Sequence, residues 1–246
     1  MNRRTRALVF AVAGAVLAAF FVAAALDMTP FGSGFHPYRD LAIPAAVKHA
    51  TANVVASVNF DQRGIDTLVE ETILLGSVLA AATLLRPVRG EEERRIPDVG
   101  RILSSTRLLG YVLLPVTIVI GIDLVVHGHL TPGGGFQGGV VIGTGIHLLY
   151  VSGSFQAVER IRPLTPYRIA EAVGAAGFVC LGLATAVAGA GFLANSIAHG
   201  TFAQLFSAGT VPILNGLVGV EVGAGVVVLL ASFLDQEILV RTGSPE

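Results

Sequence analysis

The chain of 246 residues is 53% hydrophobic and only 13% charged, and its mean hydropathy is +0.73. Water-soluble globular proteins carry about 25% charged residues, so this composition excludes an ordinary soluble domain. A formal net charge of −1 argues against a nucleic-acid partner, and the single Cys180 excludes an internal disulfide. The sequence has no CxxC, HExxH or P-loop motif and no evident nucleophile–base pair. It therefore predicts no metal site, no bound cofactor and no enzyme active site.

Six stretches of the chain are apolar enough to suggest membrane-spanning helices, each of which needs about 20 such residues. They cover residues 7–26, 67–85, 107–126, 136–152, 169–190 and 211–234. The sequence therefore predicts an all-α, polytopic membrane protein with six transmembrane helices. Basic residues precede the first stretch, so a cleaved secretion signal is the alternative interpretation there.

The basic residues between these stretches predict an orientation, because cytoplasmic loops are enriched in Lys and Arg. The N-terminus, the loops after the second and fourth stretches, and the C-terminal tail together hold 13 of the 16 basic residues. The opposite side holds only Arg39, Lys48 and Arg63. Six helices with both termini in the cytoplasm fit this distribution.

A charged segment divides the chain. Residues 91–106 include Glu91, Glu92 and Glu93 beside Arg94 and Arg95, and we interpret them as a cytoplasmic linker. Residues 1–90 then form a two-helix module, and residues 107–246 form a four-helix domain. Within the first module, residues 44–60 are too polar to span a membrane. A short helix lying at the outer interface and a buried loop are the two alternatives for them.

A sharp turn interrupts the apolar pattern within residues 122–150, IDLVVHGHLTPGGGFQGGVVIGTGIHLLY. Proline lacks a backbone N–H and glycine accepts any turn, so the Pro-Gly-Gly-Gly run predicts a reversal between two helices. Ionisable groups crowd this turn, and we expect its residues to fix the hairpin or to contact a partner. They are His127, His129, Pro132, Gly133, Gly134, Gly135, Phe136 and Gln137.

Several ionisable residues fall inside the predicted helices. At about 1.5 Å per residue, His147 lies about 16 Å into the fourth stretch and Glu221 about 15 Å into the sixth. A charge at the bilayer centre costs roughly 2.5–3.5 kcal/mol, so such groups usually face protein or water. We interpret the ionisable set as a path for protons or sodium ions. Its members are Glu70, Glu71, Asp123, His147, Glu171 and Glu221.

Some of these residues also allow a purely structural interpretation. Thr67 and Glu70 match the spacing of a capping box at a helix start, which would make Glu70 structural. A hydrogen bond between a neutral Glu221 and His147, or one to a neighbouring protein of a complex, would only fix helix packing. Replacing Glu221 by Gln separates an ion path from such a scaffold.

Two segments resemble a known family. GHLTPGGGFQGGVVIGTGIHLLY, residues 128–150, resembles the signature of the B-type (MnhB/MrpB) subunit of the multisubunit Mrp (Mnh) sodium/proton antiporter. NVVASVNFDQRGIDTLVEET, residues 53–72, resembles the two-helix module at the end of that antiporter's large A-type subunit, and also the E-type subunit of membrane-bound hydrogenases. The family form of this second motif is nearer to DFRGFDTLGE, from which this chain departs at Gln62, Ile65 and Val69.

The resemblance implies that the chain is a natural fusion of the two modules. It also implies a multi-pass subunit of a plasma-membrane complex that exchanges sodium for protons. The partners would be the large A- and D-type subunits, the small C-, E-, F- and G-type subunits, and membrane lipid. A hydrogenase-type complex driven by electron transfer is the alternative assembly. A scaffold subunit without an ion path is the alternative role.

Overall fold

The computed structural model describes residues 3–28, 32, 34–86, 102–152 and 164–242, and the described part contains helices but no strands. The chain divides into two compact units, Met1–Leu41 and Ala42–Glu246. The predicted linker at residues 91–106 lies largely outside the described residues.

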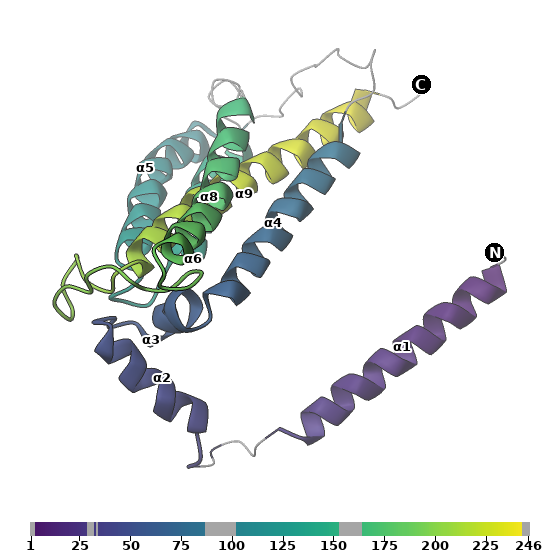
Figure 1. Cartoon of the computed structure of the whole chain (residues 1–246). Helices are drawn as coiled ribbons and strands as arrows, with labels where there is room; N and C mark the ends of the chain where they lie inside the picture. Colours follow the sequence, from purple (N-terminus) through teal and green to yellow (C-terminus); the bar gives the residue numbers. More distant parts are fainter. Residues whose placement is uncertain (1–2, 29–31, 33, 87–101, 153–163, 243–246) are drawn as a thin grey trace. The chain divides into compact units, whose positions relative to one another are not determined.

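The first unit contains helix α1, Arg3–Leu26 (Figure 1). Residues 7–26 carry no charge, and none of the residues of α1 is buried within the chain. Helix α2, Pro37–Lys48, begins in this unit with proline at its first position, where the missing N–H costs no hydrogen bond.

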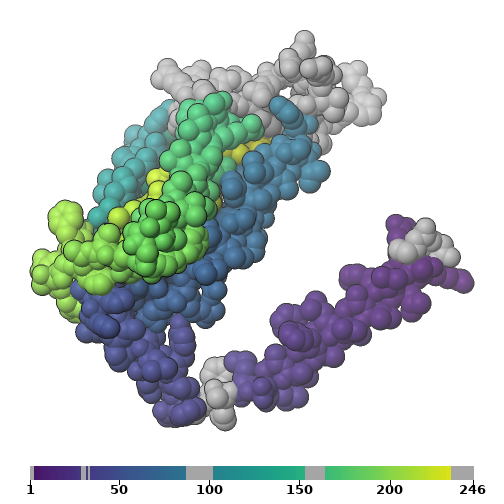
Figure 2. Space-filling model, in the orientation of Figure 1, coloured from purple at the N-terminus to yellow at the C-terminus, as the bar shows by residue number. Residues whose placement is uncertain are grey.

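The second unit is built around helix α9, Val211–Thr242. Within its membrane-length segment, Val211–Phe233, 61% of the apolar 18-residue window is buried, against 28% or less for the corresponding windows of the other candidate spans. In Figure 2 the yellow helix is visible only in patches between its neighbours. These neighbours are α4 (Gly64–Leu84), α5 (Ser104–Val126), α6 (Gly135–Val151) and α8 (Leu164–Val187).

Glycines let α6 and α9 approach closely. A Cβ atom on Gly139 would lie 2.8 Å from the carbonyl oxygen of Gly219 and from the nitrogen of Gly223. One on Gly143 would lie 2.7 Å from Val226 Cγ1. Without a hydrophobic driving force between helices in lipid, such small residues bring backbones into contact. The sequence pattern of small residues in the fourth and sixth stretches is thus explained by packing.

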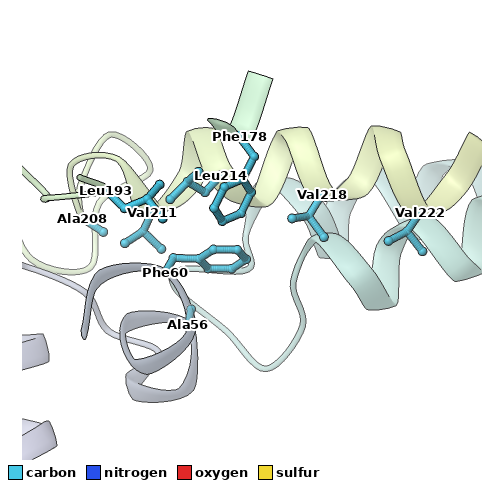
Figure 3. Packing of buried hydrophobic residues seen from close by; sticks show 9 residues of the cluster. All are labelled: Ala56, Phe60, Phe178, Leu193, Ala208, Val211, Leu214, Val218 and Val222. Carbon is cyan, nitrogen blue, oxygen red and sulfur yellow. The ribbon is translucent and has the colours of Figure 1, made fainter. Parts of the chain in front are cut away.

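A hydrophobic cluster closes the end of the unit where α5 turns into α6, which we call the hairpin end (Figure 3). The rings of Phe60 and Phe178 lie 6.4 Å apart between centroids. Phe60 comes from a short π-helical segment, η1 (Val58–Gln62), that follows the one-turn helix α3 (Val54–Ser57). The polar segment 44–60 of the sequence thus includes buried helical residues. The cluster consists of Ala56, Phe60, Phe178, Leu193, Ala208, Val211, Leu214, Val218 and Val222.

Five helices of the described part are long and apolar enough to cross a membrane: α1, α4, α5, α8 and the first part of α9. The fourth predicted span corresponds to α6, which is apolar but has only 17 residues. The capping-box interpretation of Thr67 and Glu70 is wrong. Helix α4 begins at Gly64, and the hydroxyl of Thr67 donates to the carbonyl of Asn59 at 2.7 Å.

Candidate functional site

Three of the predicted carboxylates are buried between helices α4, α8 and α9. The exposed fraction is 4% for Glu71, 2% for Glu171 and 1% for Glu221. Both carboxyl oxygens of Glu221 and one each of Glu71 and Glu171 have no protein hydrogen-bond partner. Burying a polar group without a partner is costly, and burying a charge costs more. Carboxyl groups kept in this state are suited to take up a proton or a cation.

The three carboxylates lie in a definite order along the helices. Glu221 packs against α8: a Cβ atom added to Gly174 of that helix would lie 2.7 Å from the Cβ atom of Glu221. Glu171 lies one turn earlier on α8. Both Glu71 and Glu171 are close enough to Glu221 for their charges to interact with it.

The contacts of Gly225 show where Glu71 lies along the helices relative to Glu171 and Glu221. A Cβ atom there would meet Glu171 Oε1 at 3.1 Å and Val78 Cγ2 at 3.5 Å. Val78 lies about 10 Å along α4 from Glu71, and Gly225 lies about 6 Å along α9 from Glu221. Glu71 is thus nearest the hairpin end, Glu221 follows, and Glu171 is farthest from it.

A cavity of about 130 Å³ lies beyond Glu171, at the end of the unit opposite the hairpin. Arg86 follows the last turn of α4, and Arg168 lies in the second turn of α8. Both arginines are exposed on the whole, although they line the cavity together with the buried Glu171. The cavity is lined by Leu79, Ala82, Thr83, Arg86, Arg168, Glu171 and Val228.

Three other predicted members of the path have different surroundings. Glu70 is exposed on α4. The Asp123 side chain is 66% exposed and pairs with His127 Nδ1 at 2.9 Å. His147 is half-buried on α6, and its ring lies 6.2 Å from that of Tyr150. The hydrogen bond between Glu221 and His147 that a scaffold role suggested is absent, since neither Glu221 oxygen has a partner.

The predicted hairpin is held by residues distant in sequence. Gly133 and Gly134 adopt φ angles of 154° and 150°, which side chains rarely allow. The N–H of Gly135, the first residue of α6, donates to Asn215 Oδ1 of α9 at 2.8 Å. Asn53 Nδ2 donates to the carbonyls of Gly128 at 2.8 Å and Thr131 at 2.9 Å. Pro132, within the turn, and Phe136 and Gln137, at the start of α6, are exposed.

His129 is fully buried within this hairpin. Its Nε2 lies 3.1 Å from the carbonyl oxygen of Leu205, which can only accept, so Nε2 carries the hydrogen. Burial lowers the pKa of His129 below its ordinary value, although hydrogen bonds to Leu205 and Gln204 oppose this shift. A neutral His129 therefore joins the hairpin to the segment before α9.

Sequence reasoning missed two groups of polar residues. His49 Nδ1 lies 2.6 Å from Asp61 Oδ2, and the His49 ring stacks on that of His199 with 4.4 Å between centroids. In the sequence, Arg86 and Arg168 indicate only the orientation of the helices. No sequence spacing relates His49, Asp61 and His199, because the residue after α2, the segment η1 and the segment before α9 come together only in the folded chain. In the described part, no three His, Cys, Asp or Glu residues are placed to hold a metal ion.

Five helices of membrane length in the described part define the chain as a multi-pass membrane protein. Residues 105–228 match the family model described as a domain related to the MnhB subunit of the Na+/H+ antiporter. The chain belongs to this family, as its hairpin signature suggested.

Two relatives in sequence match most of the chain. An uncharacterised protein of Methanocaldococcus jannaschii is 28% identical in an alignment 201 residues long that covers 70% of this chain and 73% of that protein. A Rhizobium meliloti protein, described as the A/B subunit of a probable K(+)/H(+) antiporter, is 30% identical in an alignment 209 residues long that covers 73% of this chain. The match covers only 20% of the Rhizobium protein.

Two solved structures resemble the fold, both at 27% identity. One is the membrane-bound sulfane sulfur reductase, an archaeal respiratory membrane complex, with a TM-score of 0.72 and coverage of 92% of this chain and 97% of that one. The other is the Mrp complex from Dietzia sp. DQ12-45-1b, with a TM-score of 0.67 and coverage of 94% of this chain. The match covers 26% of the Dietzia chain.

Proposed function

We propose that this chain supplies a path for protons, formed by Glu71, Glu221 and Glu171, to the antiporter in which it serves. Family membership makes the chain a membrane subunit of a multisubunit Na+/H+ antiporter. The observation that carries the proposal is the ordered row of three buried carboxylates without complete hydrogen bonding, on three helices that touch.

The arrangement suits stepwise transfer. A buried, unpaired carboxyl group is poorly stabilised in its charged form. It therefore takes up or releases a proton or cation when a neighbouring carboxyl group gains or loses its charge. Single carboxylates on neighbouring helices, about one or two turns apart, provide successive acceptors. Sodium ions favour several oxygen ligands, whereas a proton needs only one oxygen. We therefore assign protons, rather than sodium ions, to this row.

The partners we propose are the large A- and D-type subunits and the small C-, E-, F- and G-type subunits of the antiporter. Residues 1–90 correspond to the module at the end of the large A-type subunit, joined to an MnhB-type domain. The match to the Rhizobium A/B protein supports this fusion, because it covers 73% of this chain whereas the MnhB model covers only residues 105–228. The path needs no bound metal or cofactor beyond the transported ions.

We also propose six spans with both termini in the cytoplasm. Helix α6, fourth in chain order, would join the five helices of membrane length as a further span, since its 17 residues extend about 25 Å and the core of a bilayer is about 30 Å thick. The excess of basic residues on one side supports this orientation. The cavity beyond Glu171 would then face the cytoplasm.

Replacing Glu221 by Gln tests the path. We expect Na+/H+ exchange by the whole complex in proteoliposomes to fall at least tenfold, because the central acceptor of the row is lost. The amount of assembled complex should not change. Glu70→Gln is the matched control, since Glu70 is exposed on α4 beside Glu71 and should leave exchange near wild type. Normal exchange by an assembled Glu221→Gln complex would instead support a scaffold.

A respiratory complex is the second candidate assembly. It is favoured by the sulfane sulfur reductase structure, whose matched chain has nearly the same extent as this one. The same carboxylates would then be coupled to electron transfer. Iron–sulfur proteins that purify with the chain would favour this assembly, and their absence alongside antiporter subunits would favour the first.

A further inference from the structure

The cavity beyond Glu171 combines an unpaired carboxylate with two fixed positive charges. Its volume of about 130 Å³ leaves room for several water molecules. Glu171 Oε1 is buried without a hydrogen-bond partner, and the residue lines the cavity. Arg86 of the α4 end and Arg168 of α8 line the same cavity. Water reaching Glu171 through this cavity therefore passes beside both of these arginine residues.

We infer that this cavity is the port through which the buried row exchanges protons with water, and that Arg86 and Arg168 keep sodium ions out of it. The inference rests on the proposed path. Beyond that path, the inference names the ion that enters through the cavity, a proton, and the residues that exclude sodium, Arg86 and Arg168.

The chemistry of the lining favours a proton over a sodium ion. A guanidinium group has five N–H donors and no acceptor, and it stays charged at any physiological pH. It can neither ligate a metal cation nor stop repelling it. Among the described lining residues other than Glu171, only Thr83 has a side-chain oxygen, so a sodium ion would find few ligands.

The same positive field acts on both ions, but their affinities for a carboxylate differ greatly. A proton binds one oxygen covalently, and carboxylates bind protons at about 10⁻⁴ M, as their ordinary pKa values near 4 show. A sodium ion binds a lone carboxylate only weakly, so modest repulsion is enough to exclude it. The described charged groups around Glu171 are Arg168 on its own helix, Arg86 on α4 and, farther along the row, Glu221 on α9.

Removing the two guanidinium charges tests the selection. In the whole complex, exchange is measured against pH in proteoliposomes at two saturating sodium concentrations on the cavity side, with choline keeping ionic strength constant. For the wild type, the pH at which exchange is half-maximal should be the same at both sodium concentrations. In the variant with Arg86→Gln and Arg168→Gln, sodium ions should compete with protons for the Glu171 carboxylate. The pH of half-maximal exchange should then fall, by up to about one unit for a tenfold rise in sodium. The two single variants should show intermediate shifts.

Two control variants separate charge from other effects. Replacing both arginines by Lys keeps the positive charge and should behave as wild type. Arg107→Gln removes an arginine of α5 that does not line the cavity, and it should also behave as wild type. A wild-type pH of half-maximal exchange that moves with sodium as much as that of the glutamine variants would overturn the inference, even if the double variant failed to assemble.

The result can be distinguished from failure of the path itself. Full exchange in Glu221→Gln would contradict the proposed function whatever the arginine variants do. Loss of exchange in Glu221→Gln, with no sodium-dependent shift in the arginine variants, would contradict only the selection by Arg86 and Arg168.

Discussion

Single residues decide how the turn between α5 and α6 is anchored. Asn215 and Asn53 satisfy backbone groups of the hairpin from two distant parts of the chain. His129 is buried among them with Nε2 donating to Leu205. A side chain that must stay neutral to remain buried makes the local structure sensitive to pH.

His129 predicts an acid-sensitive hairpin. Its pKa is lowered in the folded chain, so the unfolded chain binds a proton more readily once the pH falls below about 6.5. Stability contributed here is present above that pH and is lost as the pH falls, by up to about 1.4 kcal/mol per pH unit. His129→Gln, which keeps an N–H donor, should reduce this loss.

The measurement is the melting temperature of the complex between pH 7.5 and 5, followed by size-exclusion chromatography after heating. His127→Gln is the comparison: it removes a neighbouring charge that also lowers the pKa of His129, but only as the weakest of the contributions, so it should reduce the loss less than His129→Gln does. Equal slopes against pH for wild type and His129→Gln would show that His129 does not contribute.

At the scale of elements, the N-terminal module is not an independent appendage. Helix α4 buries Gly64, Thr67, Glu71 and Val78, and it packs on α8 and α9. Phe60 of η1 belongs to the same hydrophobic cluster as Phe178 (Figure 3). One of the three carboxylates comes from this module, so the row exists only when the two modules are joined.

Because these contacts are extensive, the two modules should associate without the peptide link. Residues 1–92 and 103–246, expressed as separate chains in one cell, should purify together through a tag on either. Phe60→Ala removes a large buried side chain, at a cost of about 3–5 kcal/mol, and should reduce recovery of the untagged half. Val55→Ala is the control, since Val55 is exposed. Equal recovery with both variants would contradict a role for the Phe60 contacts.

At the scale of the whole molecule, orientation decides which solution each end of the carboxylate row meets. The hairpin and the cavity lie at opposite ends of the helices. In the six-span arrangement that we propose, the 13-to-3 division of basic residues would place the cavity end on the cytoplasmic side. Protons would then leave or enter the row on the cytoplasmic side through the cavity.

Labelling of single cysteines checks this topology. Cys180 is first replaced by Ala, and a cysteine is introduced at Thr131, at Ser104 or at Ser244. A membrane-impermeant maleimide added outside intact cells should label only the Thr131 position, because the other two lie at the cytoplasmic ends of the six-span arrangement. Labelling of Ser244 from outside would contradict a cytoplasmic C-terminus.

Hydropathy alone located most of the helices, because a helix in lipid needs a continuous run of apolar residues, and such a run can be recognised in the sequence. The predicted starts of α1, α4, α5 and α8 are three to five residues late, because polar residues continue a helix beyond its apolar part. The Pro-Gly-Gly-Gly turn was equally local. Glu71, Glu171 and Glu221 were recognisable as candidates because a carboxylate inside an apolar run is costly.

Tertiary structure alone decided which candidate residues lie close together. Glu70 and Glu71 are adjacent in sequence, but a helix rotates about 100° per residue, so only Glu71 is buried. Asp123 lies at a helix end, where its side chain reaches the surface and His127. Arg86 and Arg168 line one cavity because the C-terminal end of α4 and the N-terminal end of α8 lie side by side there. Sequence determined where charge enters the apolar helices, and packing determined which of those charges meet, because contacts between helices depend on side-chain direction rather than on sequence distance.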